Sequence, residues 1–188
     1  DQVTLTVNGL PVVGAGNDVS YCVDAGLQTL VGSPSGGTWS GIGITNGSSG
    51  IFDPGSVVSG TYTLTYRYTD GNSCWNSDTR EVTVNPLPSI DLGDDTLLIC
   101  DNTSQTLDAG TGFASYLWND GSSAQTLTVN TAGTYTVTGT DANSCTASDS
   151  MVIEVLNVDI TQNDTTICQG DSLVLKLNST ELYGTLNN

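Results

Sequence analysis

Five cysteines are the residues of this sequence best suited to covalent chemistry: Cys22, Cys74, Cys100, Cys145 and Cys168. Protein zinc sites usually contain Cys-x-x-Cys pairs or histidines, and this chain has neither. Disulfides, by contrast, stabilise small domains in oxidising compartments. The cysteines therefore favour disulfides over a metal centre, and they predict a secreted or cell-surface location.

The residue types give little support for catalysis. With no histidine in the chain, the commonest general base is missing, and the Ser, Thr and Cys nucleophiles have no evident activating partner. Two carboxylates could hydrolyse a glycoside, but among 20 acidic residues some pair will always be suitably spaced. We therefore expect a protein that is not an enzyme.

The acidic residues limit the partners of the chain. Against three basic residues they give a net charge of -17, which repels nucleic-acid phosphates. No apolar run approaches 18 residues, so no membrane span is predicted. No cofactor is required, although carboxylates near the predicted turns could hold a structural Ca²⁺; the alternative is that they are solvated turn residues. The candidate calcium ligands are Asp18, Asp70, Asp94, Asp95 and Asp141.

Three sequence landmarks recur along the chain and define its elements. The linker TVNGLP at 6–11 returns as TVNPLP at 83–88, and an acidic turn precedes a cysteine at 16–22, 93–100 and 162–168. The segment at 60–74, GTYTLTYRYTDGNSC, is matched by GTYTVTGTDANSC at 133–145. Thr alternates there with Tyr, Leu or Val, which indicates a half-buried β-strand followed by a turn.

These landmarks predict a tandem repeat. Residues 1–9 are expected to be the last strand of a preceding repeat, 10–86 a first complete repeat and 87–157 a second. Residues 158–188 would begin a truncated third repeat. A fragment of that length is too short to bury a core alone.

The register of the repeats suggests how the cysteines pair. Within each repeat it predicts the disulfides Cys22–Cys74 and Cys100–Cys145, and Cys168 would be unpaired by truncation. Each bond would close a loop of about 45 to 50 residues and contribute roughly 4 kcal/mol in the chain-entropy model. Which strands the bonds join stays open.

Aromatic residues at repeated positions are candidates for the core. Trp39 and Trp118 each follow a cysteine at nearly the same distance, which fits a tryptophan packed near a disulfide better than a sugar-stacking platform. Tyr62 and Tyr135 occupy matching strand positions. Trp75 has no counterpart in the second repeat, so it is the candidate for an exposed contact.

The motifs GTWSG at 37–41, YLWNDG at 116–121, AQTLTV at 124–129 and GTYTVT at 133–138, together with the linkers, resemble the immunoglobulin-like and PKD-like repeats of giant Bacteroidota surface proteins. The resemblance implies an all-β fold of tandem immunoglobulin-like sandwiches, each with one disulfide. It also implies export by type IX secretion and a role in gliding, attachment or prey capture.

The resemblance leads to a functional expectation with one alternative. The repeats would be a stalk or spacer, with neighbouring repeats as partners and with self-association or filament formation as further options. The alternative is a module that itself binds a surface glycan or protein. A Bacteroidota O-glycosylation pattern, Asp followed by Ser or Thr and then an apolar residue or Thr, marks Thr96, Ser150, Thr165 and Ser172.

Overall fold

The computed structural model describes residues 2–156, 174–176 and 181–183. It is all-β, with immunoglobulin-like sandwiches, and this confirms the predicted fold class. The chain divides into two compact units. The first contains Asp1–Ser89 together with Thr140–Thr146, and the second contains Ile90–Gly139 and the chain from Ala147 onward.

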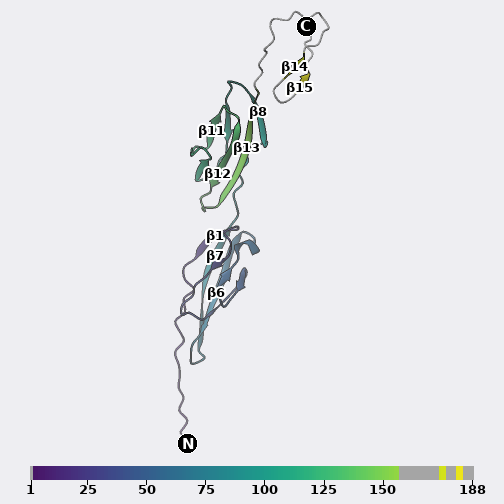
Figure 1. Ribbon diagram of the computed structural model, residues 1–188. Helices are drawn as coiled ribbons and strands as arrows, with labels where there is room; N and C mark the ends of the chain where they lie inside the picture. The colour runs from purple at the N-terminus through teal and green to yellow at the C-terminus, as the bar shows by residue number, and fades with distance from the viewer. Residues whose placement is uncertain (1, 157–173, 177–180, 184–188) are drawn as a thin grey trace, which may run out of the picture. The chain divides into compact units, whose positions relative to one another are not determined.

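The first unit consists of two sheets (Figure 1). One has the order β1-β7-β6-β3, formed by Val19–Cys22, Trp75–Asn85, Gly60–Thr69 and Thr38–Ser40. The other has the order β2-β5-β4, formed by Gln28–Thr29, Ile51–Phe52 and Ile44–Asn46. A single 3-10 turn, η1 (Pro54–Ser56), follows β5.

The second unit has the same plan. Its larger sheet has the order β10-β12-β13-β8, formed by Ser115–Trp118, Gly133–Thr140, Thr146–Leu156 and Thr96–Cys100. Its smaller sheet pairs β11 (Thr126–Val129) with β9 (Gln105–Asp108). A separate hairpin pairs β14 (Val174–Lys176) with β15 (Glu181–Tyr183).

The alternating sequence of the long hairpin explains how each sandwich forms. In β6 and β7 every second side chain points into the sandwich, and Leu64, Tyr66, Val82 and Val84 are buried. The short strand β1 pairs in parallel with the last third of β7, with Cys22 opposite Asn85. The parallel pair β8–β13 repeats this arrangement.

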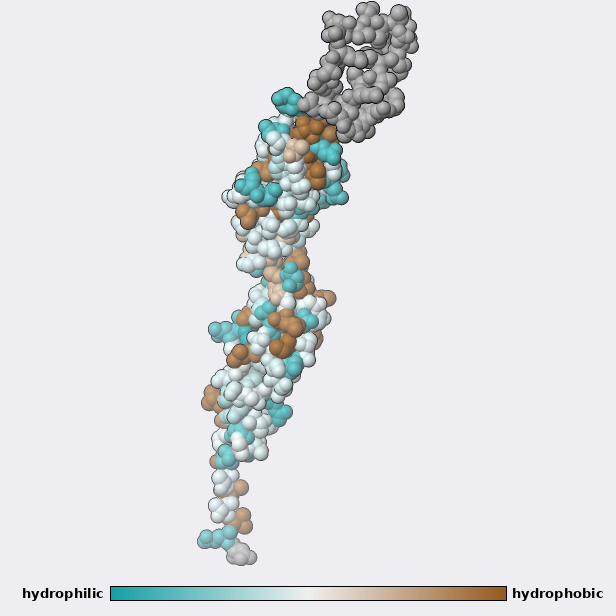
Figure 2. All heavy atoms as spheres, in the orientation of Figure 1, coloured by the Kyte–Doolittle hydropathy of each residue, from teal (hydrophilic) through white to brown (hydrophobic). Residues whose placement is uncertain are grey.

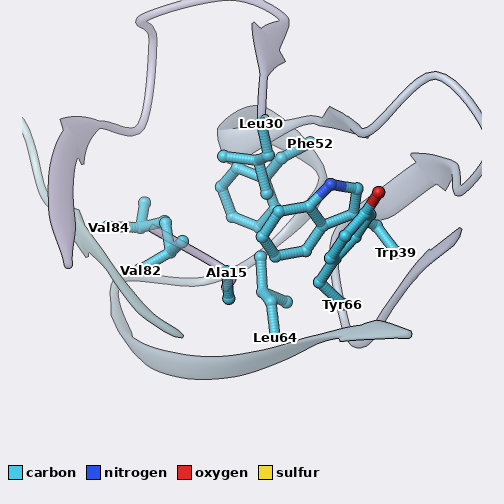
Figure 3. Close-up of a cluster of buried hydrophobic side chains, with 8 residues drawn as sticks. All are labelled: Ala15, Leu30, Trp39, Phe52, Leu64, Tyr66, Val82 and Val84. Atoms are coloured by element: carbon cyan, nitrogen blue, oxygen red, sulfur yellow. The ribbon is translucent and has the colours of Figure 1, made fainter. Parts of the chain in front are cut away.

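The core of the first unit forms around one tryptophan. Figure 3 shows the Trp39 indole beside the Tyr66 ring, with Leu30 and Leu64 nearby. The two ring centroids are 5.1 Å apart and the rings are tilted by 43°. The same core contains Phe52 from β5 of the smaller sheet, so its burial holds the two sheets of the sandwich together. The equivalent Trp118 is 1% exposed in the second core.

The two units differ at one matching strand position. Tyr66 has Gly139 as its counterpart in the aligned strand of the second repeat. A Cβ added at Gly139 would lie 2.5 Å from the Phe113 ring. The Phe113 ring thus lies against Gly139, which has no side chain. In the first unit the aromatic ring at this strand position is that of Tyr66 itself.

The buried hydroxyl of Tyr66 gives a stability prediction. It accepts a hydrogen bond from the Gly37 amide at 2.8 Å and donates one to the Pro34 carbonyl. Tyr66→Phe leaves both backbone groups without this partner, so we expect a loss of about 1 to 3 kcal/mol in the free energy of unfolding. Urea denaturation measures it. Tyr68→Phe, at a partly buried ring, is the control and should change stability by less than about 0.5 kcal/mol.

Arg80 is a buried cation, and its Nε atom has no hydrogen-bond partner. Its guanidinium lies 5.9 Å from the centroid of the Trp39 ring. The aligned residue of the second repeat is Met151, which is buried in the second core. We therefore expect Arg80→Met to leave the stability unchanged or raise it by about 1 to 2 kcal/mol.

The matched variant Arg80→Ala tests whether packing is what matters at this position. It removes the side-chain stem as well as the charge, so it should destabilise the first unit by about 2 kcal/mol or more. Urea denaturation of both variants gives the comparison. If Arg80→Met is as damaging as Arg80→Ala, the charge itself is needed.

The exposed faces of the units are mostly polar. In Figure 2 apolar and hydrophilic side chains are interspersed on the visible face. In the part of the chain that the structure describes, no helix is long and apolar enough to cross a membrane.

Candidate functional site: a disulfide joining two sequence repeats

The turn that ends each long hairpin positions a cysteine. In the second repeat, the Oδ1 atom of Asp141 accepts hydrogen bonds from the amides of Asn143 and Cys145, both at 2.8 Å. Ser144 takes a left-handed backbone conformation with φ of 66°. The Asp141 amide donates back to the Cys145 carbonyl at 2.9 Å, which closes the turn. The sequence Asp-x-Asn-Ser-Cys therefore forms a hydrogen-bonded turn that fixes the position of the cysteine.

A second cysteine is fixed at the end of β1. Cys22 is the last residue paired with β7, and the next amide, that of Val23, donates to the Asn85 carbonyl at 2.9 Å. The Asn85 side chain is buried, and its Nδ2 atom donates to the Ser20 hydroxyl at 2.6 Å. The position of Cys22 is thus set by both backbone and side-chain contacts.

The structure joins these two cysteines. Cys22 and Cys145 form a disulfide with a Cα–Cα distance of 5.6 Å and a sequence separation of 123 residues. Cys145 is 1% exposed, and the turn Thr140–Thr146 belongs to the first compact unit. The loop is longer than the predicted loops, and in the chain-entropy model it contributes about 5 kcal/mol.

The predicted pairs Cys22–Cys74 and Cys100–Cys145 are therefore wrong. Cys22 lies opposite Asn85 at the end of β7, whereas Cys74 immediately precedes Trp75 at its start. At about 3.3 Å per residue, the length of this strand separates the two cysteines by roughly 35 Å. Cys100 and Cys145 lie at opposite ends of β13 in the same way. A disulfide requires Cα atoms less than about 7 Å apart.

Two further cysteines are unbonded among the described residues: Cys74, which is partly buried, and Cys100, which is exposed. Cys168, which we expected to be unpaired by truncation, lies outside the described residues.

The structure does not bring the candidate calcium ligands together. Within the described ranges, no group of three or more acidic or sulfur-containing side chains could hold a metal ion. Asp18 accepts from the Glu81 amide at 2.8 Å, and Asp70 from the Cys74 amide at 2.9 Å. Asp94 and Asp95 are exposed. A bound calcium ion thus stays an untested expectation.

Asp78 connects the middle of β7 to the segment before β1. Its Oδ2 atom accepts a hydrogen bond from the Ala15 amide at 2.8 Å, and this bond, with a smaller contribution from the Thr79 amide, lowers the pKa of Asp78 below its ordinary value. Because the folded-state pKa is lowered, the stabilisation is present above the unfolded-state pKa. It is lost as the pH falls through the folded-state pKa.

Asp78→Asn tests this acid dependence. The variant should be less stable than the wild type at about pH 6, and the difference should shrink towards about pH 2, as the pH falls through the folded-state pKa and the wild-type carboxyl takes up a proton. Urea denaturation at both pH values measures it, and the effect will be modest because the carboxylate is exposed to solvent screening. A difference that is constant with pH would show that the charge is not responsible.

The remaining candidate residues occupy varied positions. Trp39 and Trp118 are buried, while Tyr62 and Tyr135 are half-buried at the edges of their cores. Trp75 is 53% exposed, and the Arg67 guanidinium lies 4.2 Å from its ring centroid. Thr96 and Ser150 are exposed, whereas Thr165 and Ser172 lie outside the described residues.

Two of the candidate calcium ligands have the turn role that the sequence offered as the alternative. Asp70 and Asp141 each bind the amide of a cysteine four residues later. What sequence reasoning missed is that this turn fixes the cysteine at the hairpin end, and the signal for it is the repeated Asp-x-Asn-Ser-Cys motif.

The fold and this site define a class: immunoglobulin-like sandwich units with a disulfide, Cys22–Cys145, that connects the two predicted repeats. No family model matches the chain, and no curated protein matches it.

Solved structures show distant similarity to the chain. One is the Bacteroides ovatus mixed-linkage glucan utilization locus SGBP-B in complex with a mixed-linkage heptasaccharide, with 16% identity, a TM-score of 0.28, and coverage of 78% of this chain and 46% of that one. Another is Dscam1 isoform 6.9, N-terminal four Ig domains, with 16% identity, a TM-score of 0.33, and coverage of 73% and 42%. A third is DIP-gamma IG1+IG2, with 11% identity, a TM-score of 0.38, and coverage of 74% and 93%. The chain spans less than half the length of the first two.

Proposed function

We propose that this chain is a load-bearing spacer in the stalk of a large secreted surface protein, of the kind that Bacteroidota export by type IX secretion for gliding or attachment. The observation that carries the proposal is the Cys22–Cys145 disulfide, which links two sequence repeats covalently. A disulfide of this kind forms in an oxidising, extracellular setting. No chemistry at a catalytic centre enters this role.

Two further features support a mechanical role. Each sandwich has its own core around a buried tryptophan, so each unit can resist unfolding by itself. The high negative charge favours solubility and repels like-charged neighbours at the distances where salt does not screen it.

A direct binding role is the second candidate, and the exposure of Trp75 favours it. Exposed aromatic rings are common anchors in glycan and protein interfaces. The partner would then be a surface glycan or a protein bound by the first unit.

A replacement experiment in the parent cell separates the two functions. Deleting residues 10–157 from the full-length protein should reduce attachment, and inserting two unrelated immunoglobulin-like units in their place should restore it. A spacer depends on length and stiffness, whereas a binding module depends on its own surface. If only the original sequence restores attachment, and Trp75→Ala abolishes it, the chain is a binding module.

A further inference from the structure

The two unbonded cysteines occupy the same structural positions as the two bonded ones. Cys74 ends the hairpin turn of the first repeat, as Cys145 ends that of the second. Cys100 ends the parallel strand β8, as Cys22 ends β1. Among the described residues there is therefore one complete disulfide, Cys22–Cys145, and one further cysteine of each kind, Cys74 and Cys100, without a partner.

The local geometry around Cys74 matches that around Cys145 closely. The Cys74 amide donates to Asp70 Oδ1 at 2.9 Å, and the Asp70 amide donates to the Cys74 carbonyl at 2.8 Å. Ser73 has a φ of 64°, as Ser144 has 66°. The turn is thus already in the conformation that forms the Cys145 bond.

The backbone hydrogen bonds around Cys100 match those around Cys22. The amide of Asp101 donates to the Leu156 carbonyl at 3.0 Å, and the Thr103 amide donates to the Cys100 carbonyl at 3.2 Å. The matching bonds after Cys22 are Val23 to Asn85 and Ala25 to Cys22. A sulfur that ends β8 and is exposed can be reached from outside the second unit.

The linker at 6–11 shows where a partner for Cys74 would lie. The linker at 6–11 repeats the linker at 83–88, so Asn8 corresponds to Asn85, the residue opposite Cys22. Asn76, two residues after Cys74, donates from Nδ2 to the Pro11 carbonyl at 3.0 Å. Asn8 is only three residues from Pro11, at most about 11 Å of chain.

This contact places the linker beside the turn that contains Cys74. A strand-end cysteine paired with Asn8, as Cys22 is with Asn85, would therefore be close to Cys74. The apolar residues Val3, Leu5 and Val7 are at least 86% exposed, as the inward face of a last strand would be without the rest of its sandwich.

We propose that Cys74 and Cys100 belong to a disulfide relay, meaning a series of disulfides that each join one repeat to the next. In this series the cysteine that ends the short parallel strand of each repeat (the strand-end cysteine, as Cys22) bonds to the cysteine that ends the hairpin turn of the next (the turn cysteine, as Cys145). Cys74 takes the strand-end cysteine of a preceding immunoglobulin-like repeat, and Cys100 takes the turn cysteine of a following one. The inference rests on the proposed tandem array. Bonding within a repeat is excluded by the roughly 35 Å length of the central strand.

The chemistry of each bond is thiol–disulfide exchange with a disulfide oxidant, such as an oxidised dithiol–disulfide oxidoreductase. One cysteine thiolate attacks the oxidant's disulfide and releases one of its sulfurs as a thiol. The second cysteine thiolate then attacks the mixed disulfide and releases the other. The two protein thiols lose two protons and two electrons, and one oxidant disulfide becomes two thiols.

Such a relay has a consequence for the whole array. Successive loops overlap, because Cys100 lies inside the loop that Cys22–Cys145 closes. Every peptide bond between the first and last bonded cysteines is then bridged by at least one disulfide. Disulfides within repeats would leave each linker unbridged.

Disulfide mapping of the full-length protein tests the relay. Free thiols are alkylated in denaturant without reductant, the protein is digested with pepsin at acidic pH to suppress exchange, and linked peptides are identified by mass spectrometry. We expect Cys74 linked to a preceding repeat, Cys100 linked to a following one, and Cys22–Cys145 as the internal control. Alkylated Cys74 or Cys100, a Cys100–Cys168 link, or a Cys74–Cys100 link between two copies would overturn the relay.

The outcome is independent of the cell experiment on the spacer. If the relay is mapped but unrelated units fail to restore attachment, the proposed function fails and the relay stands. If unrelated units restore attachment but Cys74 and Cys100 are alkylated, the relay fails and the spacer stands.

Discussion

A chain cut once in the linker at 86–88 should stay in one piece until a reductant is added. We would insert a specific protease site after Leu87, which is 42% exposed in the linker. The cut falls between Cys22 and Cys145, so the disulfide still holds both fragments. A non-reducing gel should show one species after cleavage, and a reducing gel should show two.

Two controls make this result specific. In the Cys22→Ser variant the same cut should release two fragments without reductant. A site inserted after Leu10, which is 67% exposed and precedes Cys22, should release its short peptide under both conditions. Separation of the wild-type fragments at the linker without reductant would instead support bonds within repeats.

Pulling the chain from its two ends should extend it by roughly 400 Å less than a variant without the disulfide. The bond bridges 123 residues, and each extended residue contributes at most about 3.6 Å. Force applied to the ends passes through the two sulfurs, so most of both sandwiches is shielded. Single-molecule force spectroscopy of the wild type and the Cys22→Ser/Cys145→Ser variant measures the difference in contour length.

The matched control for the pulling experiment is Cys74→Ser/Cys100→Ser, because these cysteines form no bond among the described residues. Its contour length should equal that of the wild type. Equal lengths for all three proteins would show that the disulfide does not bear load.

The strands could be predicted from local patterns. The alternation in 60–69 and 133–138 puts one side chain in two on the core face, and β6 and β12 follow it. The burial of Trp39 and Trp118 follows from their matching positions after a cysteine. The use of Gly139 and Phe113 in place of Tyr66 was not predictable, because it depends on contact between residues that lie far apart in sequence.

The cysteines show most clearly where sequence reasoning ends. Composition and spacing were enough to predict disulfides rather than a metal site, because these depend only on residue types and motifs. The partner of each cysteine depends on distance in the folded sheet. An eleven-residue strand, β7, separates Cys22 from Cys74 within one repeat, and β13 does the same for Cys100 and Cys145. The sequence by itself thus determined the all-β class and the chemistry of the bond, because these depend on residue types and local patterns, while only the tertiary structure decided that Cys22 bonds to Cys145.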